Sequence, residues 1–228
     1  MLIPARDEAP TIGATVAAAR SIPGVTRVIV IDDGSRDDTD QVAEKAGAKV
    51  VRLFGSHGKG AALEAGARRV EDADIVLLLD GDLGESASQG KLLAAPLIDG
   101  EADMAIAVFP RPAGKAGFGL VKSLARSGIR KLGGEFEAVA PLSGQRALTR
   151  SCMATTRPFS AGYGVEVGLT IRALRAGFRL VEVPTTMAHS ATGRDLKGFI
   201  HRGRQFVHVA LALIALWGEK PPLRRESS

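Results

Sequence analysis

Two aspartates that flank a glycine are the most chemically suggestive residues of this sequence. Asp80 and Asp82 follow five consecutive apolar residues, 75–79. An apolar run without alternation is typical of a strand covered on both faces, as in a parallel sheet. The carboxylates would then leave the sheet at the carboxyl ends of its strands, where open α/β sheets bind ligands. Their spacing suits a divalent cation that takes further ligands from a diphosphate, although Asp-Gly is also ordinary turn chemistry.

The size and composition favour one domain with a substantial core. The chain has 228 residues, of which 45% are hydrophobic. The single cysteine, Cys152, excludes an intrachain disulfide and fits a reducing compartment. No apolar run reaches the roughly 18–20 residues that span a bilayer. We therefore expect a cytoplasmic protein. Because only three residues precede Pro4, a start further upstream is left open.

Charge is distributed unevenly along the chain. Residues 1–110 hold 11 Lys and Arg against 18 Asp and Glu, a net charge of −7, whereas residues 111–228 hold 19 against 7, a net charge of +12. An acidic half suits metal binding, and a basic half suits an anionic acceptor, a phospholipid surface or nucleic acid. Nucleic acid is disfavoured because aromatic residues make up only 4% of the chain and no nucleic-acid-binding motif is present.

The order of strand and helix patterns predicts the fold class. After a short first strand, apolar runs predict strands at 28–31, 48–53, 75–79, 104–109 and 178–183. Helices are expected at 11–20, 37–46, 61–70, 86–98, 119–132, 163–176 and 206–217. This alternation predicts an α/β fold with parallel strand pairing. We expect one domain over 1–219, with a donor and metal half at 1–110, an acceptor half at 111–219 and a frayed tail at 220–228.

Two common nucleotide-binding motifs are absent. The segment from Gly58 to Gly60 lacks the Ser or Thr that follows the lysine of a phosphate-binding loop. The first strand-to-helix turn holds residues 4–8, which contain no glycine, so the Rossmann fingerprint is missing as well. Asp33, at the end of the second predicted strand, could still accept hydrogen bonds from a ribose or a base.

Four short motifs, taken in order, resemble a known family. They are residues 4–8 (PARDE), 30–39 (VIDDGSRDDT), 58–60 (GKG) and 80–82 (DGD). This set resembles the family 2 glycosyltransferases with the GT-A fold, and in particular the polyprenyl-phosphate and dolichyl-phosphate mannosyltransferase group, over roughly residues 1–190. The resemblance implies a mainly parallel central sheet with helices on both faces. It also implies transfer of a hexose from a UDP- or GDP-linked sugar to an acceptor.

The resemblance also implies roles for individual residues. Asp82, with Asp80 in support, would bind Mg²⁺ or Mn²⁺ on the donor diphosphate, and the cation would neutralise charge on the leaving nucleotide. Lys59 would lie near the phosphates. The donor contacts that the resemblance implies are Pro4, Ala5, Glu8, Ile31, Asp33, Lys59, Asp80, Gly81 and Asp82.

The second half would supply the acceptor side. Glu166, at the start of a predicted helix, could act as a base, as a hydrogen-bonding partner of donor or acceptor, or as a helix-capping carboxylate; with Asp82 it forms the predicted catalytic pair. His189 could complete the metal shell, as a histidine does in related GT-A enzymes, or be a surface residue. The predicted acceptor contacts are Ser143, Gly144 and Arg194.

The acceptor is less constrained than the donor. The group resemblance favours polyprenyl phosphate. However, Gly84 stands where the lipid-phosphate transferases often carry a Gln ligand, and residues 163–169 also resemble glucosyl-3-phosphoglycerate synthases. The alternative is therefore a soluble phosphorylated acceptor such as 3-phosphoglycerate. A noncatalytic nucleotide-sugar-binding subunit is a third hypothesis.

A basic run precedes the apolar segment 206–217. Its members are Arg194, Lys197, His201, Arg202 and Arg204. Basic residues followed by an apolar helix are typical of peripheral contact with an anionic membrane, here the inner face. The same helix could equally pack on the domain or across a homodimer.

Overall fold

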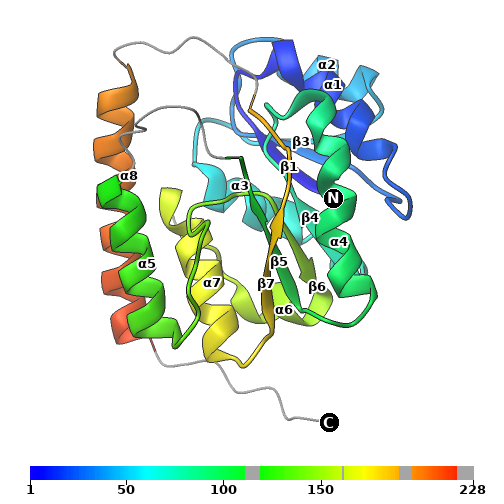
Figure 1. The fold of residues 1–228 in the computed structure, drawn as a ribbon. Helices are drawn as coiled ribbons and strands as arrows, with labels where there is room; N and C mark the ends of the chain where they lie inside the picture. Colours follow the sequence, from blue (N-terminus) through cyan, green and yellow to red (C-terminus); the bar gives the residue numbers. More distant parts are fainter. Residues whose placement is uncertain (111–118, 161, 190–196, 220–228) are drawn as a thin grey trace.

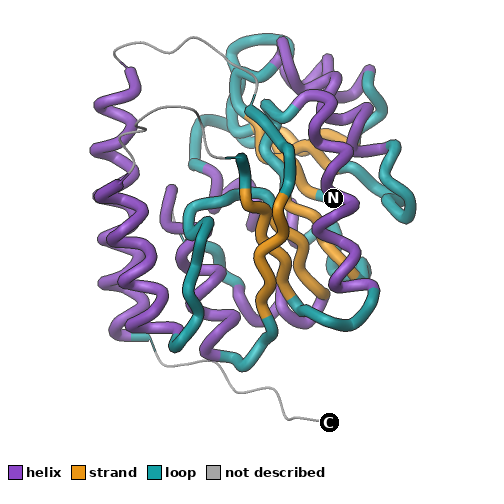
Figure 2. Tube along the Cα trace, in the orientation of Figure 1, coloured by secondary structure: helices purple, strands orange, loops and turns teal. Residues whose placement is uncertain are grey.

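The protein is organised around one seven-stranded sheet, which Figures 1 and 2 show between layers of helices. The computed structural model describes residues 1–110, 119–160, 162–189 and 197–219, with the backbone alone described at Tyr163 and at 197–205. The strand order is β3-β2-β1-β4-β6-β5-β7. The strands are β1 (Leu2–Ala5), β2 (Ile29–Asp32), β3 (Lys49–Arg52), β4 (Ile75–Leu78), β5 (Met104–Val108), β6 (Arg146–Thr149) and β7 (Leu180–Pro184).

Most of the described helices were predicted, but α6 was missed and α8 begins before the predicted residue 206. The helices are α1 (Ala9–Arg20), α2 (Thr39–Lys45), α3 (Lys59–Ala67), α4 (Gly90–Ile98), α5 (Gly119–Gly133), α6 (Arg150–Thr156), α7 (Val165–Arg175) and α8 (Lys197–Gly218). Two predicted helices begin as short 3₁₀ segments, η1 (Gly84–Gln89) before α4 and η2 (Gly162–Gly164) before α7. Within the described residues, no helix is long and apolar enough to cross a membrane.

Strand pairing confirms the predicted α/β class with one addition. β1 pairs in parallel with β2 and β4, β2 with β3, and β5 with β7. β6 lies antiparallel between β4 and β5. The sequence analysis assigned no strand there, because this segment is four residues long and opens on a charged residue, Arg146, so it gives no apolar-run signal.

The run in β4 lacks alternation because both faces of the sheet are covered. Leu77 and Leu79 belong to the core under α1 and α4, whereas Val76 and Leu78 belong to the core under α3, α6 and α7. Each such side chain contributes about 1.5–3 kcal/mol when fully buried. Packing on both faces fixes β4, and with it the place where Asp80 and Asp82 leave the sheet.

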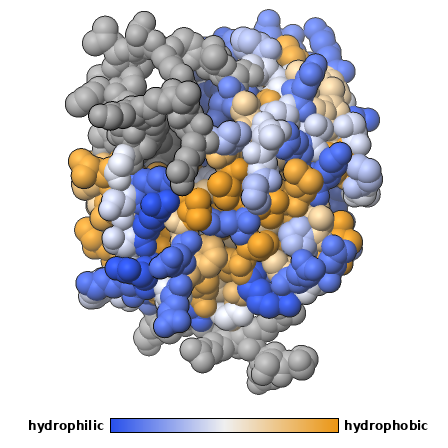
Figure 3. Space-filling model, viewed as in Figure 1, coloured by the Kyte–Doolittle hydropathy of each residue, from blue (hydrophilic) through white to orange (hydrophobic). Residues whose placement is uncertain are grey.

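A third core joins α5, α7 and α8 beside the sheet, and Figure 1 shows α5 and α8 side by side at one edge. Gly128 allows the close approach of α5 to α8, since a Cβ there would collide with the side chain of Leu213. Figure 3 shows hydrophobic and hydrophilic residues together along this edge. The outer face of α8 exposes Val207, Leu211, Ile214 and Trp217.

Candidate active site

Helix α1 holds the turn that carries the two aspartates. The hydroxyls of Thr11 and Thr15 donate to the carbonyl oxygen of Gly81 at 3.2 and 2.8 Å. The amide of Gly84 donates to the Thr15 hydroxyl at 2.8 Å. A Cβ at Gly81 would lie 3.3 Å from that of Ala5, so the glycine also lets the turn pack closely on the first strand. Sequence reasoning missed the threonines; their only signal was an i, i+4 polar pair on a predicted helix.

A candidate metal site forms where this turn meets the segment after β7. Ligand atoms of Asp80, Asp82 and His189 all lie within 4.8 Å of one another. His189 Nδ1 lies 2.9 and 3.1 Å from the two carboxylate oxygens of Asp82. The Phe109 ring packs 5.0 Å from the imidazole, between ring centroids, and limits its orientation. Carboxylate oxygens with one imidazole suit Mg²⁺ or Mn²⁺ and leave coordination positions open.

The electrostatics of this group follow from its contacts. The hydrogen bond to Asp82 raises the pKa of His189, against the opposing effect of partial burial. Glu8 lies near both aspartates, and its pKa is raised by burial first and then by the negative charges of Asp82 and Asp80. Three carboxylates close together repel one another, and a cation would relieve that repulsion. The residues present therefore fit a divalent metal.

Lys59 connects the two halves of the chain at this site. Its Nζ lies 2.7 Å from a carboxylate oxygen of Asp80 and 3.0 Å from one of Glu166. Burial alone would lower the pKa of Lys59, but the two carboxylates outweigh it and raise that pKa. Burial likewise opposes ionisation of Asp80, and Lys59 outweighs it, so the pKa of Asp80 is lowered. Glu166, in the first turn of α7, is buried and makes an ion pair with Lys59.

The segment before β6 lies directly against this ion-pair cluster. A Cβ at Gly144 would collide with Lys59 Nζ and lie 3.1 and 3.3 Å from the carboxylate oxygens of Asp80. Gln145 Nε2 donates to the other Asp80 oxygen at 2.7 Å. Sequence reasoning placed Ser143 and Gly144 on the acceptor side but missed Gln145, whose signal was a polar run entering a sheet. Arg194, the third predicted acceptor contact, lies outside the described residues.

The predicted donor contacts lie along the ends of β1 and β2. Asp33 accepts hydrogen bonds from the amides of His57 and Gly58 at 2.7 and 2.8 Å, and from the Ser56 hydroxyl at 3.1 Å. Its carboxylate therefore holds the loop that leads into α3. The side chain of Ile31 is fully buried in the core that includes α3, which leaves its backbone as the part available to a ligand.

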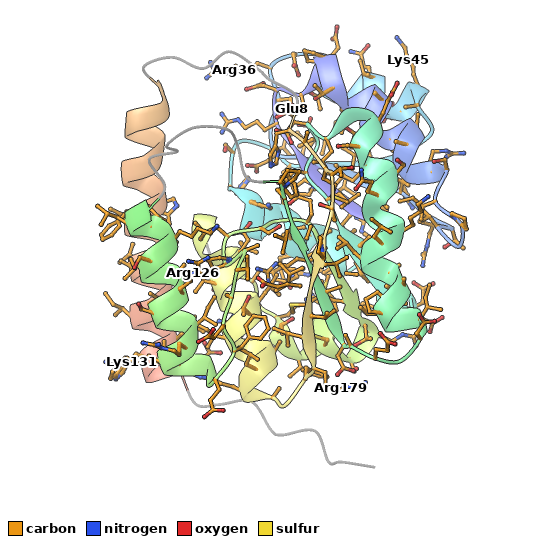
Figure 4. The ribbon with its side chains drawn as sticks, viewed as in Figure 1. Glu8, Arg36, Lys45, Arg126, Lys131 and Arg179 are labelled. Carbon is orange, nitrogen blue, oxygen red and sulfur yellow. The ribbon has the colours of Figure 1, made fainter. Side chains whose placement is uncertain are left out.

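The remaining donor predictions lie on the same edge. Pro4 and Ala5 form the end of β1, in register with Ile31 and Asp32. Glu8 immediately precedes α1, and Figure 4 shows it near the start of that helix. The donor roles of all these residues stay predictions.

The sequence and the fold match those of a known family. The Glycosyl transferase family 2 profile matches residues 1–155. The chain belongs to this family, as the sequence motifs predicted, and its solved structural neighbours share the GT-A fold.

Among curated proteins, the chain is similar to Glycosyltransferase AglJ of Haloferax volcanii, with 33% identity over 86% of this chain and 64% of that protein. It is also similar to glucosyl-3-phosphoglycerate synthase of Mycolicibacterium paratuberculosis, with 34% identity over 75% of this chain and 58% of that protein. The chain thus spans about three fifths of the length of these relatives.

Solved structures give a similar result. The glucosyl-3-phosphoglycerate synthase of Mycobacterium tuberculosis in complex with Mn²⁺, UDP and phosphoglyceric acid has a TM-score of 0.78 and 30% identity, covering 96% of this chain and 78% of that one. The same enzyme with Mg²⁺ and UDP also gives a TM-score of 0.78, at 30% identity over 96% of this chain and 79% of that one.

Proposed function

We propose that this chain is a metal-dependent glycosyltransferase that moves a hexosyl group from a UDP-sugar to a small phosphorylated acceptor of the phosphoglycerate class. The observation that carries the proposal is the meeting of Asp80, Asp82 and His189 within 4.8 Å, next to the ion pairs of Lys59. Similarity to enzymes whose complexes contain UDP with Mg²⁺ or Mn²⁺ supports this assignment.

In this proposal Asp82 and His189 hold the cation, with Asp80 beside them. The bound cation supplies Lewis-acid stabilisation to the leaving diphosphate. Lys59 contributes a fixed positive charge at the same edge, since its partners keep it protonated. Glu166 faces this lysine from the second half of the chain. It is placed to receive a hydrogen bond from an acceptor hydroxyl once Lys59 is shared with the phosphates.

The acceptor class differs from the first one that the sequence suggested. The comparisons give no support to polyprenyl phosphate and support the alternative, because several relatives are glucosyl-3-phosphoglycerate synthases. The net charge of +12 over residues 111–228 suits a phosphorylated acceptor. Gly84, which stands where the lipid-phosphate transferases often carry a Gln ligand, agrees with a soluble phosphorylated acceptor.

We propose further that residues 1–219 act as one GT-A unit. Asp80 and Asp82 come from the predicted donor half, whereas His189 and Glu166 come from the predicted acceptor half. The metal site is thus shared between the halves instead of lying within the first. The division into a donor half and an acceptor half therefore fits the uneven charge and the proposed substrates, but the proposed metal ligands come from both halves.

Peripheral membrane contact and homodimerisation remain predictions about the α5–α8 edge. The exposed apolar residues of α8 and the basic residues Arg126, Arg130 and Lys131 of α5 support a contact surface there. Figure 4 shows Arg126 and Lys131 on α5. Lys131 lies 4.7 Å above the Trp217 ring. Flotation with phosphatidylcholine vesicles, with and without phosphatidylglycerol, tests the membrane, and light scattering after size exclusion tests the dimer.

The proposed activity is tested in two stages. Thermal-shift measurements with UDP and GDP, with and without Mn²⁺, should give the largest stabilisation with UDP plus Mn²⁺. UDP-glucose, other UDP-hexoses and GDP-mannose are then offered with 3-phosphoglycerate or with a short polyprenyl phosphate, and nucleotide release is measured. Metal-dependent nucleotide binding with no turnover on any acceptor would favour the noncatalytic subunit.

A further inference from the structure

Arg146 is a fully buried arginine directly beneath the candidate active site. Among the residues that the structure describes, it makes no ion pair, and its Nη2 has no hydrogen-bond partner. Burial lowers its pKa to about 10, against the opposing fields of Glu166 and Glu182, so the side chain stays charged at neutral pH. A buried charge without a counter-ion is costly to the fold. We therefore look for the role of this side chain in the hydrogen bonds that its guanidinium donates.

The guanidinium joins two segments that both contact Lys59. Its Nε donates to the carbonyl oxygen of Ser143 at 2.9 Å. Its Nη1 donates to the Thr170 hydroxyl at 2.9 Å. That hydroxyl in turn donates to the carbonyl oxygen of Glu166, one helical turn earlier in α7, at 2.9 Å. Arg146 thus ties the segment before β6 to the turn of α7 that carries Glu166.

Both tied segments touch the ion-pair cluster. Gly144 packs against Lys59, and Gln145 holds the carboxylate of Asp80. Glu166 pairs with Lys59 from the other side. A shift of either segment would therefore change the position of Lys59 relative to its two carboxylates. The Ser143 hydroxyl is also buried and has no hydrogen-bond partner among the described residues.

We propose that Arg146 is a positioning residue that keeps the 143–145 segment and Glu166 in register around Lys59, and so sets the acceptor side of the site. This rests on the proposed transferase function. The planar guanidinium is suited to the task because its donor nitrogens are separate atoms held in one rigid plane, whereas the donors of an ammonium all radiate from a single rotatable nitrogen. Arg146 acts through its neighbours, since its burial keeps it from reaching a substrate.

The first test requires no activity. Hydrogen exchange is compared between wild type, Arg146→Met and Arg146→Lys. Exchange should rise in peptides covering 142–146 and 162–170 in both variants, and stay unchanged in α1. Melting temperature is compared as well, because Arg146→Met removes a costly buried charge but leaves the Ser143 carbonyl without this donor. Unchanged exchange in both peptides would overturn the proposal.

The second test separates donor from acceptor. Arg146→Met should lower kcat/KM for the phosphorylated acceptor by about 100-fold, the order expected for misplacement near 1 Å. The Kd for UDP with Mn²⁺ should rise by less than about 10-fold, since Asp82 and His189 keep their contact while Lys59 shifts. Arg146→Lys should not restore turnover. Equal loss of donor affinity, or full rescue by lysine, would contradict the bridging role.

Two further variants control these measurements. Thr170→Val removes one link of the bridge and should lower acceptor kcat/KM in the same direction by about 10-fold, the order expected for one buried hydrogen bond. Arg150→Met makes the same substitution at an exposed arginine that bonds Asp74 before β4, and should leave kinetics unchanged. If wild type turns over no acceptor, the proposed function fails, while the exchange experiment still decides the role of Arg146.

Discussion

The proposed donor side and the proposed acceptor side of the site are built in different ways. Asp80, Asp82 and Asp33 come from the ends of strands or the turns just after them. Helix α1 holds the turn at Gly81, and the loop before α3 bonds Asp33. Glu166 and His189 come from separate segments of the second half, and both reach the first half through side chains. The donor-side acids thus lie at strand ends that the sequence motifs mark, although distant segments also hold them, whereas the acceptor-side residues lie on segments that only the packing brings to the site. Substitutions on the two sides should therefore separate donor affinity from acceptor use.

The largest effect is expected at Asp82. Asp82→Ala should abolish metal-dependent nucleotide binding and lower turnover by about 1000-fold or more, since it removes a predicted ligand of the catalytic cation. Calorimetric titration with UDP, with and without Mn²⁺, measures this. Asp74→Ala, an exposed aspartate just before β4, is the matched control and should bind as wild type. Equal UDP affinity with and without Mn²⁺ in both wild type and Asp82→Ala would contradict a metal site at this edge of the sheet.

A large effect confined to the acceptor side is expected at Glu166. Glu166→Gln keeps the shape but removes the charge that pairs with Lys59. Turnover should fall by about 100-fold or more if the carboxylate assists the acceptor hydroxyl, with the Kd for UDP and Mn²⁺ changed little. Steady-state kinetics with varied acceptor, beside nucleotide titration, separates these quantities. Wild-type turnover in this variant would mean that Glu166 serves only as a structural partner of Lys59.

Gly144→Ala tests whether the two sides are coupled. The added methyl would displace Lys59 Nζ and press on Asp80, so both donor affinity and turnover should fall, by about 10-fold or more. Gly119→Ala is the control, since a Cβ there meets open space among the described residues. Nucleotide titration and acceptor kinetics are measured on both. A fall in acceptor use alone would show that Lys59 can move without affecting the donor.

A smaller effect is expected at His189. His189→Ala should weaken Mn²⁺ binding by about 10- to 100-fold, because the two aspartates remain. Titration of Mn²⁺ in the presence of UDP measures the change. Addition of imidazole should recover part of the affinity. An unchanged metal affinity would place His189 outside the coordination shell.

The smallest effect is expected in how the stability of the metal-free protein depends on pH. The pKa of His189 is raised above its ordinary value of 6.5, first by the hydrogen bond to Asp82. The protonated imidazole therefore stabilises the fold below about pH 6.5, and this contribution is lost as pH rises through the raised pKa. In EDTA, wild type should melt above His189→Ala at about pH 6 and approach it at about pH 9. A difference in melting temperature between wild type and His189→Ala that is the same at both pH values would contradict the stabilising bond between protonated His189 and Asp82.

Much of the fold was predictable because its signals are local. Apolar runs gave six of the seven strands, and glycine and polar turns gave most of the helix boundaries. β6 was missed because it is short and opens on Arg146. Asp80 and Asp82 could be predicted as site residues because they follow a buried strand. Gln145 was missed because its only signal is the polar run that enters the sheet.

The sequence by itself determined the α/β class, the strand-end carboxylates and the family, because hydrophobic runs and turn motifs are set by neighbouring residues. Only the tertiary structure decided that Lys59 joins Asp80 to Glu166, that His189 meets Asp82, and that Arg146 is buried beneath them. These contacts join residues 21 to 107 positions apart. Packing of the whole sheet and its helices brings such residues together, so no short pattern in the sequence can encode them.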